Sequence, residues 1–291
     1  MSHFRTHTPA PPRTETKVAI LAAAALLACS VTACALDQPF AGLGNVLGSP
    51  AQAKTATSSQ NSILAAVQSK VAAGADAKTL RQELSNVIKG GCCSGEEWEA
   101  WKAPDMECLS RAYAPAAVES RLEAARFLLD NGVSVNQKND DKEEPLDEAL
   151  GLLIWEALPN GYSVEGEGLS KMAALLVSEG ANANGKAGAY MVPMGTGFTG
   201  TPLGVAAMAG SVELVRLLLE KGAKVNDPSE ISAEDVSGRY AVTPLKLAQD
   251  GLEKAGSGVE KNKYQEIIGM LKAAGGKLTP SAAKKGKGKK R

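Results

Sequence analysis

A helix-ending glycine recurs along the chain in segments that share one pattern. The segments are residues 127–136 (FLLDNGVSVN), 175–184 (LLVSEGANAN), 217–226 (LLLEKGAKVN) and the shorter 270–277 (MLKAAGGK), with a possible fifth at residues 71–76. In each, a helix packs its apolar residues, the glycine takes the left-handed conformation that other residues resist, and a small residue follows under the turn. The pattern therefore predicts a chain built from repeated helix-and-turn units.

The third copy extends backward into a complete pair of helices. Thr201 can cap the first helix, and Pro202 suits its first turn. Ala206 and Ala207 allow the second helix, residues 212–219, to lie close against the first. Aromatic residues make up only 4 % of the chain, which favours helices held by aliphatic packing over a β-sandwich. We therefore expect an all-α fold.

The stretch at residues 201–226, TPLGVAAMAGSVELVRLLLEKGAKVN, resembles an ankyrin repeat almost throughout. Gly204 departs from the family pattern, which usually has a histidine at this position, so the family's side-chain hydrogen bond is lost. Residues 243–248 (TPLKLA) repeat the opening of the pattern, and residues 144–149 (EPLDEA) are a weaker copy.

This resemblance implies both a fold and a function. The fold is an all-α ankyrin-repeat solenoid of about four to five degenerate repeats. The repeats occupy residues 110–278, behind a helical N-terminal cap at residues 61–109. The function is binding of another protein through the concave face and the loops, with no cofactor and no metal.

The repeats are longer than regular ankyrin repeats. Successive glycines at positions 132, 180, 222 and 275 are 48, 42 and 53 residues apart, against about 33 in a regular array. We expect insertions within helix hairpins at residues 150–168 and 249–263, and in loops between repeats at residues 185–200 and 227–242. Such loops cost little stability and often carry the binding surface.

The loop at residues 190–198 (YMVPMGTGF) is unusually apolar for a connection between polar helices. Its large side chains either form a tip that inserts into a partner or fold back onto the adjoining repeats. On the first interpretation, the partner-binding residues are Tyr190, Met191, Met194 and Phe198, with Arg239 and Tyr240 in the second loop. The GxGxxG pattern at residues 195–200 is interpreted as a hairpin turn rather than a dinucleotide site, because an ankyrin-like unit follows it.

The N-terminus has the features of an export signal. A basic segment precedes the apolar run at residues 18–35, which is marginal in length for a membrane span. Residues 31–34 (VTAC) resemble the lipobox of bacterial lipoproteins, so we expect residues 1–34 to be a signal peptide and Cys34 to be lipidated. This implies a periplasmic protein anchored to the outer membrane by a flexible tether at residues 35–60. Cleavage after Ala35, which releases a soluble secreted protein, is the alternative.

The distribution of histidine and of charge excludes several functions. His3 and His7 both precede the apolar run, so the mature protein lacks histidine, and this excludes Ser-His-Asp catalysis and HExxH zinc sites. Six basic residues within residues 284–291 leave the rest of the chain acidic, so nucleic acid is not an expected partner. We expect residues 279–291 to form a disordered basic tail.

Three cysteines lie within the expected cap. Cys92, Cys93 and Cys108 are too few for a four-ligand zinc site in a protein without histidine. In an oxidising compartment Cys108 is expected to pair with Cys93 or Cys92, and a loop of about 15 residues contributes about 3 kcal/mol in the chain-entropy model.

These observations favour a binding protein over an enzyme. The expected role is a scaffold or an immunity-type inhibitor in the bacterial envelope, and a soluble secreted ankyrin effector is one alternative. A carboxylate-dependent periplasmic hydrolase is the other, and it requires two carboxyl groups about 5 to 10 Å apart in a cleft. Asp140, Asp141, Glu143 and Glu144 lie in a polar run that is interpreted as a solvated turn. No motif places an acid opposite a base.

Overall fold

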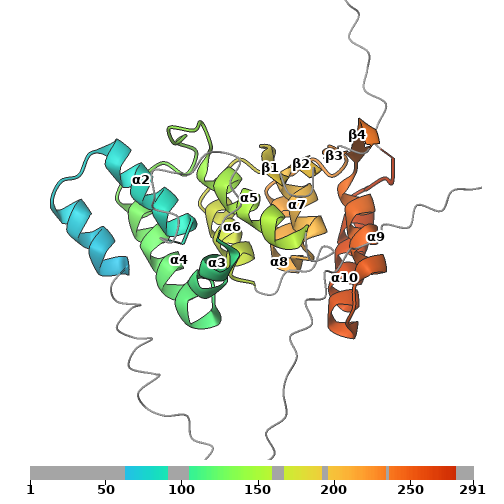
Figure 1. The fold of residues 1–291 in the computed structure, drawn as a ribbon, viewed down its shortest axis with the longest axis horizontal. Helices are drawn as coiled ribbons and strands as arrows, with labels where there is room; N and C mark the ends of the chain where they lie inside the picture. The colour runs from blue at the N-terminus through green and yellow to red at the C-terminus, as the bar shows by residue number, and fades with distance from the viewer. Residues whose placement is uncertain (1–62, 91–104, 159–166, 192–195, 234–235, 280–291) are drawn as a thin grey trace, which may run out of the picture. The chain divides into compact units, whose positions relative to one another are not determined.

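The computed structural model describes residues 63–90, 105–158, 167–191, 196–233 and 236–279, and these are mostly helical (Figure 1). After a helix at residues 63–72, the helices are α2 (Ala77–Ile88), α3 (Met106–Ala112), α4 (Pro115–Asp130), α5 (Pro145–Ala157), α6 (Gly168–Ser178), α7 (Pro202–Met208), α8 (Val212–Glu220), α9 (Pro244–Lys254) and α10 (Gly258–Ala273). The strands are β1 (Ala187–Met191), β2 (Thr196–Gly200), β3 (Ser229–Ala233) and β4 (Val236–Val242).

Three helices begin where the Thr-Pro and Glu-Pro sequences predict. At α7 the Thr201 hydroxyl accepts a hydrogen bond from the Gly204 N–H at 3.1 Å. Thr243 caps α9 in the same way, and Glu144 and Asp147 form a reciprocal capping box at α5. These bonds satisfy N–H groups that have no partner within the helix, so each helix start is defined locally.

The glycines of the repeated segments take the predicted left-handed conformation. Gly132, Gly180, Gly222 and Gly275 have φ angles of +94°, +96°, +81° and +85°. Gly74, in the possible fifth segment, has a φ angle of +72°. Because residues with a Cβ resist this conformation, the glycines end their helices at fixed points.

The helices form pairs that contact one another in chain order. α2 packs on α4, α5 on α6, α7 on α8, and α9 on α10. Helices α4, α6, α8 and α10 are successive neighbours, and so are α2, α5, α7 and α9 (Figure 1). The apolar residues of the repeated segments enter the core between these helices. Leu128, Leu176 and Leu218 are each 0 % exposed, as are Ala206 and Ala207 at the predicted close contact of α7.

Asparagine side chains link each repeated turn to the next. Asn136, Asn184 and Asn226 close the first three repeated segments. In each, Nδ2 donates to the carbonyl oxygen of the next segment's glycine, at 3.1, 3.3 and 3.1 Å. Oδ1 accepts from the N–H two residues after that glycine, at 3.1, 2.9 and 2.7 Å. The same geometry at three junctions places the fourth segment in the same series as the others.

Arg121 joins the expected N-terminal cap to the first repeat. Its guanidinium donates to the carbonyl oxygens of Ala112, Val87 and Gly90 at 2.8, 3.3 and 2.5 Å. It also lies 5.8 Å from the centre of the Tyr113 ring. Because these carbonyl groups lie at the ends of α2 and α3, one side chain of α4 satisfies both helix ends.

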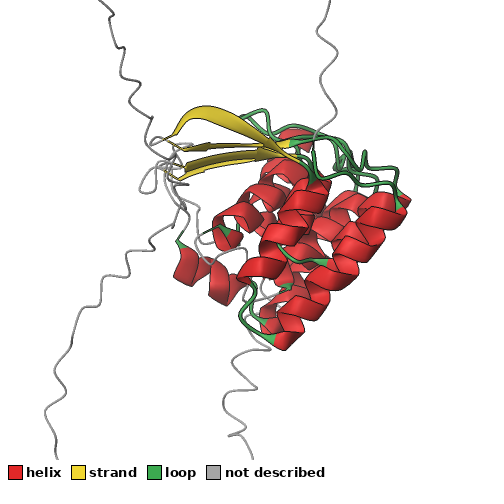
Figure 2. Cartoon of the chain, turned by 90° about the vertical axis from the view of Figure 1, so that its right-hand side faces the viewer, coloured by secondary structure: helices red, strands yellow, loops and turns green. Residues whose placement is uncertain are grey.

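Both loop insertions form strands, which corrects the expectation of an all-α fold. Strands β1 and β2 form one antiparallel hairpin, and β3 and β4 form the other. β2 also pairs with β3, so the hairpins join in a single sheet of order β1-β2-β3-β4. Figure 2 shows the strands side by side at one end of the helices. Extended loops need partners for their backbone N–H and C=O groups, and successive repeats bring the two hairpins close enough to supply them.

The insertion expected within the last helix hairpin is mostly helical rather than a loop. α9 continues to Lys254 and α10 begins at Gly258, where Ser257 and Glu260 form a capping box. Part of the other hairpin insertion, residues 159–166, lies outside the described residues.

Some predicted features fall outside the described residues. They are the signal peptide at residues 1–34 with Cys34, the tether at residues 35–60, Cys92, Cys93, and the tail from residue 280 onward. Cys108 of α3 is disulfide-bonded, and because the other cysteines all lie outside the described residues, its pairing with Cys93 stays a prediction. Within the described part of the chain, no helix has the length and apolar character needed to cross a membrane.

Candidate functional site

Phe198 does not belong to an exposed tip, so its prediction as a partner-binding residue is wrong. It lies in β2 and is 1 % exposed. A Cβ at Gly200, two residues further along the same strand, would lie 2.4 Å from Cε1 of the Phe198 ring. The missing side chain at Gly200 therefore lets the ring fold back over its own strand. Of the two interpretations of this loop, folding back onto the repeats holds for Phe198, which anchors the hairpin in the core.

The other predicted partner-binding residues lie in the outer parts of the sheet. Tyr240 of β4 is 49 % exposed. Arg239 precedes it in β4, and Tyr190 and Met191 end β1. The side chains of these three residues, and Met194 as a whole, lie outside what the structure describes. Their role in binding stays a prediction.

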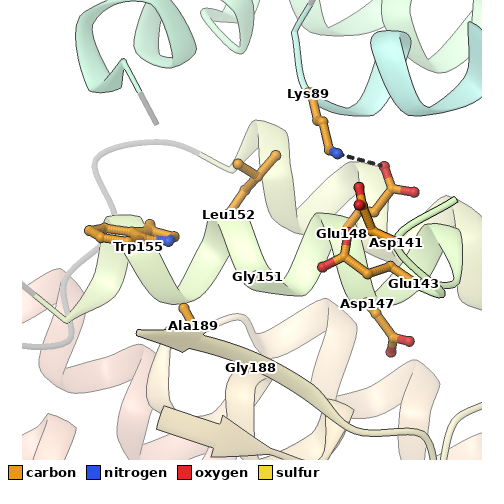
Figure 3. Close-up of a pocket in the computed structure, with 10 residues that line it drawn as sticks. All are labelled: Lys89, Asp141, Glu143, Asp147, Glu148, Gly151, Leu152, Trp155, Gly188 and Ala189. Carbon is orange, nitrogen blue, oxygen red and sulfur yellow. Dashed lines mark ion pairs between the residues drawn. The ribbon is translucent and has the colours of Figure 1, made fainter. Parts of the chain in front are cut away.

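A pocket that no sequence motif indicated opens between α5 and β1 (Figure 3). It is lined by Lys89, Asp141, Glu143, Asp147, Glu148, Gly151, Leu152, Trp155, Gly188 and Ala189, and its volume is about 80 Å³. The helix and the strand pack closely at Gly151, where a Cβ would make an ordinary contact at 3.6 Å with the carbonyl oxygen of Gly188. Acidic side chains gather at one end of the pocket, and Trp155 lies at the other.

Glu148 is a buried anchor at the acidic end. Its Oε1 accepts hydrogen bonds from Arg81 Nη2 at 2.5 Å and from Asn139 Nδ2 at 3.1 Å. The Ser85 hydroxyl donates to Oε2, and Lys89 Nζ lies 3.9 Å from the same oxygen. A carboxylate that is 0 % exposed is tolerated only with such partners. Glu148 therefore joins α5 to α2.

Asp147 and Glu143 are harder to ionise than carboxyl groups in water. Burial is the main cause and raises the pKa of Asp147 from 3.8 to about 6, while Glu144 and Glu143 act in the same direction. Burial also raises the pKa of Glu143. Lys138 near Asp147 and Lys89 near Glu143 oppose these shifts without reversing them. Arg81 and Lys89 at this end are engaged by Glu148, and burial still outweighs the nearby positive charge at Asp147 and Glu143.

The interpretation of residues 140–144 as a solvated turn is only partly right. Asp140 and Asp141 are exposed, whereas Glu143 is half-buried and faces the pocket. One sequence signal could have located this site. The Glu-Pro helix start places Glu148 one turn before Leu152, on the face of the helix that an apolar residue shares. A charged residue at such a position indicates a buried ion pair.

The pocket bears directly on the hydrolase alternative. Several carboxyl groups line the pocket, but Glu148 is already engaged by four side chains and Asp147 accepts a hydrogen bond from the Glu144 N–H. The volume of about 80 Å³ is far below the roughly 300–1,000 Å³ of typical small-molecule sites, which does not favour a glycan-binding cleft. Within the described ranges, no three acidic, cysteine or histidine side chains are arranged to hold a metal ion.

The helix pair α7–α8 combines the capped start, the left-handed glycine and the asparagine bonds. Residues 200–230 match the family model of the ankyrin repeat. The match supports an ankyrin-repeat protein and, with it, a protein-interaction scaffold; no enzyme family is found. No curated protein matches the chain.

In the segment that matches the ankyrin-repeat model, a residue of β3 fills the space above Gly204. A Cβ at Gly204 would lie 2.2 Å from Oγ of Ser229, which is 0 % exposed. The Ser229 hydroxyl has no hydrogen-bond partner among the described residues. The side-chain hydrogen bond expected of the family at this position is therefore replaced by packing of β3 against α7.

Proposed function

We propose that this protein binds another protein through its ankyrin repeats and acts in the bacterial envelope as a scaffold or an immunity-type inhibitor. The ankyrin match at residues 200–230 carries the proposal, because ankyrin repeats are protein-interaction modules. The asparagine bonds and the shared sheet support it, since a surface held in a fixed geometry loses less conformational entropy when it binds.

The proposed binding surface is the outer part of the sheet. Tyr240, at 49 % exposure, is the described aromatic side chain that suits an interface there. The adjoining strand ends carry the sequence-predicted residues Tyr190, Met191 and Arg239. Phe198 is left out because it belongs to the core.

Crosslinking and copurification from a bacterial envelope test this surface. The wild type is compared with a variant in which Tyr190, Met191, Met194 and Tyr240 are serine and Phe198 is kept. A control variant replaces Met106 and Val259, which are 37 % and 69 % exposed on α3 and α10, by serine. A discrete partner lost only from the first variant supports the proposal. A partner that both variants retain contradicts the surface, and no partner from the wild type contradicts the binding function.

The proposed location rests on the lipobox-like segment at residues 31–34. We infer that Cys34 is lipidated, that residues 35–60 form a tether, and that the protein is held at the outer membrane. Labelled palmitate should enter the wild type and not Cys34→Ser, and fractionation should place the wild type in the outer membrane. A soluble, unlabelled wild type would support the secreted alternative instead.

The proposed disulfide joins Cys108 to Cys93. Mass spectrometry of unreduced peptides distinguishes it from a bond to Cys92, which would correct the assignment.

A further inference from the structure

The pocket between α5 and β1 has two chemically different ends (Figure 3). Trp155, Leu152 and Ala189 form an apolar end, and Glu143 and Asp147 lie at the acidic end. Arginine and lysine side chains have the matching arrangement, because an apolar stem carries a cationic head. A wholly apolar or an anionic side chain would leave one end of the pocket unmatched.

The charges of the lining residues favour an incoming cation. Lys89 is the cation among the described lining residues, and it faces Glu148 at 3.9 Å. Three further carboxyl groups, those of Asp141, Glu143 and Asp147, line the same pocket. Because Glu143 and Asp147 are partly withdrawn from water, their attraction for a cation is screened less than it would be at an open surface.

The pocket is small, and its volume suits the end of a protein side chain better than a whole metabolite. A volume of about 80 Å³ equals the space of about two to three water molecules in the liquid. Arginine is favoured over lysine, because its planar guanidinium group can donate two hydrogen bonds to one carboxylate at the acidic end while its apolar stem lies toward Trp155.

We propose that this pocket receives the side chain of an arginine of the partner protein, with the guanidinium group at the acidic end beside Glu143 and the stem toward Trp155. The inference rests on the proposed binding function and names the chemistry of the partner. The charge complementarity of the acidic end and the apolar wall beside it carry the choice of occupant.

Titration of the full chain with Nα-acetyl-arginine amide tests the pocket without knowledge of the partner. The indole N–H of Trp155 and the carboxyl carbons of Glu143 and Asp147 are observed by NMR at pH 7. We expect saturable shifts of all three, and at least about tenfold weaker binding of the neutral isostere Nα-acetyl-citrulline amide. Equal binding of the two amides, or shifts that never saturate, would overturn the proposal.

A charge-matched pair of variants shows whether binding occurs in the pocket. Glu143→Gln with Asp147→Asn removes two carboxylates there, and Glu123→Gln with Asp130→Asn removes two exposed carboxylates of α4. The first variant should lose arginine amide binding at least about tenfold, and the second should bind as the wild type does. If the first variant unfolds, Trp155→Leu provides the same test through the carboxyl carbons. Unchanged binding in the folded pocket variants overturns the proposal.

Two comparisons separate the possible occupants and the two proposals. If the full chain does not bind the arginine amide but a chain ending at Thr279 does, the basic tail occupies the pocket and the assignment to a partner is wrong. In the copurification experiment, a partner retained by Glu143→Gln with Asp147→Asn overturns the pocket inference and leaves the binding function standing. A wild type without any partner contradicts the binding function, while the titration still decides whether the pocket takes arginine.

Discussion

Asn184 is one side chain that holds two repeats together. It bonds the carbonyl oxygen of Gly222 at 3.3 Å and the N–H of Lys224 at 2.9 Å, both in the next repeat. Asn184→Ala leaves both backbone groups without these partners, so we expect the free energy of unfolding to fall by about 1–3 kcal/mol in urea denaturation. Asn131→Ala is the control, because among the described residues the side chain of Asn131 bonds the carbonyl oxygen of Phe127 in the helix that it ends. Its loss should be within about 0.5–1 kcal/mol, and equal losses would mean that the link between repeats adds nothing.

Gly204 and Ser229 form a pair whose substitutions should not be additive. A Cβ at Gly204 meets Ser229 Oγ at 2.2 Å, so Gly204→Ala should lower stability by about 1–3 kcal/mol through overpacking. Ser229→Ala removes a buried hydroxyl group without a partner and should be neutral or stabilising. The double variant should recover most of the loss. Thermal unfolding of the four proteins measures this coupling, and additive effects would contradict it.

Asp147 makes stability depend on pH in a predictable direction. Its pKa of about 6 in the folded protein lies above its ordinary value of 3.8, so the protonated form favours folding. This contribution is fully present below about pH 4 and is lost as the pH rises to about 6. The stability of Asp147→Asn relative to the wild type should therefore increase between pH 4 and pH 7. Urea denaturation across this range checks it, and a difference between Asp147→Asn and the wild type that does not change with pH would contradict it.

At the scale of elements, the buried pair of Arg81 and Glu148 determines how α2 attaches to α5. Glu148→Ala leaves a buried guanidinium group without its counter-ion, and we expect a loss of about 3–5 kcal/mol. Hydrogen exchange should show the loss of protection first in α2, because successive helix pairs contact mainly their neighbours. Glu119→Ala serves as the control, because Glu119 is exposed and meets Lys171 at the surface, so its effect should be below about 1 kcal/mol. Protection lost evenly along the chain would show that α2 does not open separately.

The sheet is the element that changes how the repeats are coupled. β2 and β3 belong to successive hairpins, and their pairing adds backbone hydrogen bonds between repeats that already share asparagine bonds. Small residues lie where β2 and β3 pair. Gly197 and Gly200 of β2 and Ser229 of β3 are all buried there. Long insertions thus become part of the rigid structure instead of separate loops.

At the scale of the whole molecule, stability should be distributed along the chain of helix pairs. Ile267 is 0 % exposed in α10, so Ile267→Ala should lower the free energy of unfolding by about 2–5 kcal/mol. Because α9 and α10 contact mainly α7 and α8, hydrogen exchange should rise in α9 and α10 while α4 and α6 stay protected. An increase of equal size in all four helices would instead indicate a single cooperative unit.

Much of the local architecture could be predicted from sequence because it depends on neighbouring residues. Left-handed turns at Gly132, Gly180 and Gly222 follow from the absence of a Cβ at glycine. The helix cap at Thr201 follows from its hydroxyl group, which lies three residues before an N–H without a partner in the helix. The match at residues 200–230 supports the ankyrin resemblance. Such a repeat can be recognised from sequence because its pattern lies in consecutive residues.

Only the tertiary structure decided the sheet and the pocket. β2 pairs with β3 because stacked repeats bring together strands that are about 30 residues apart, and no local pattern encodes that distance. Phe198 turns inward because Gly200 leaves room for its ring. The pocket needs α2, α5 and β1 together, and it is their packing that withdraws Glu143 and Asp147 from water. Sequence by itself determined the helices and their ends through local sterics, whereas burial and the meeting of distant side chains depend on the folded chain.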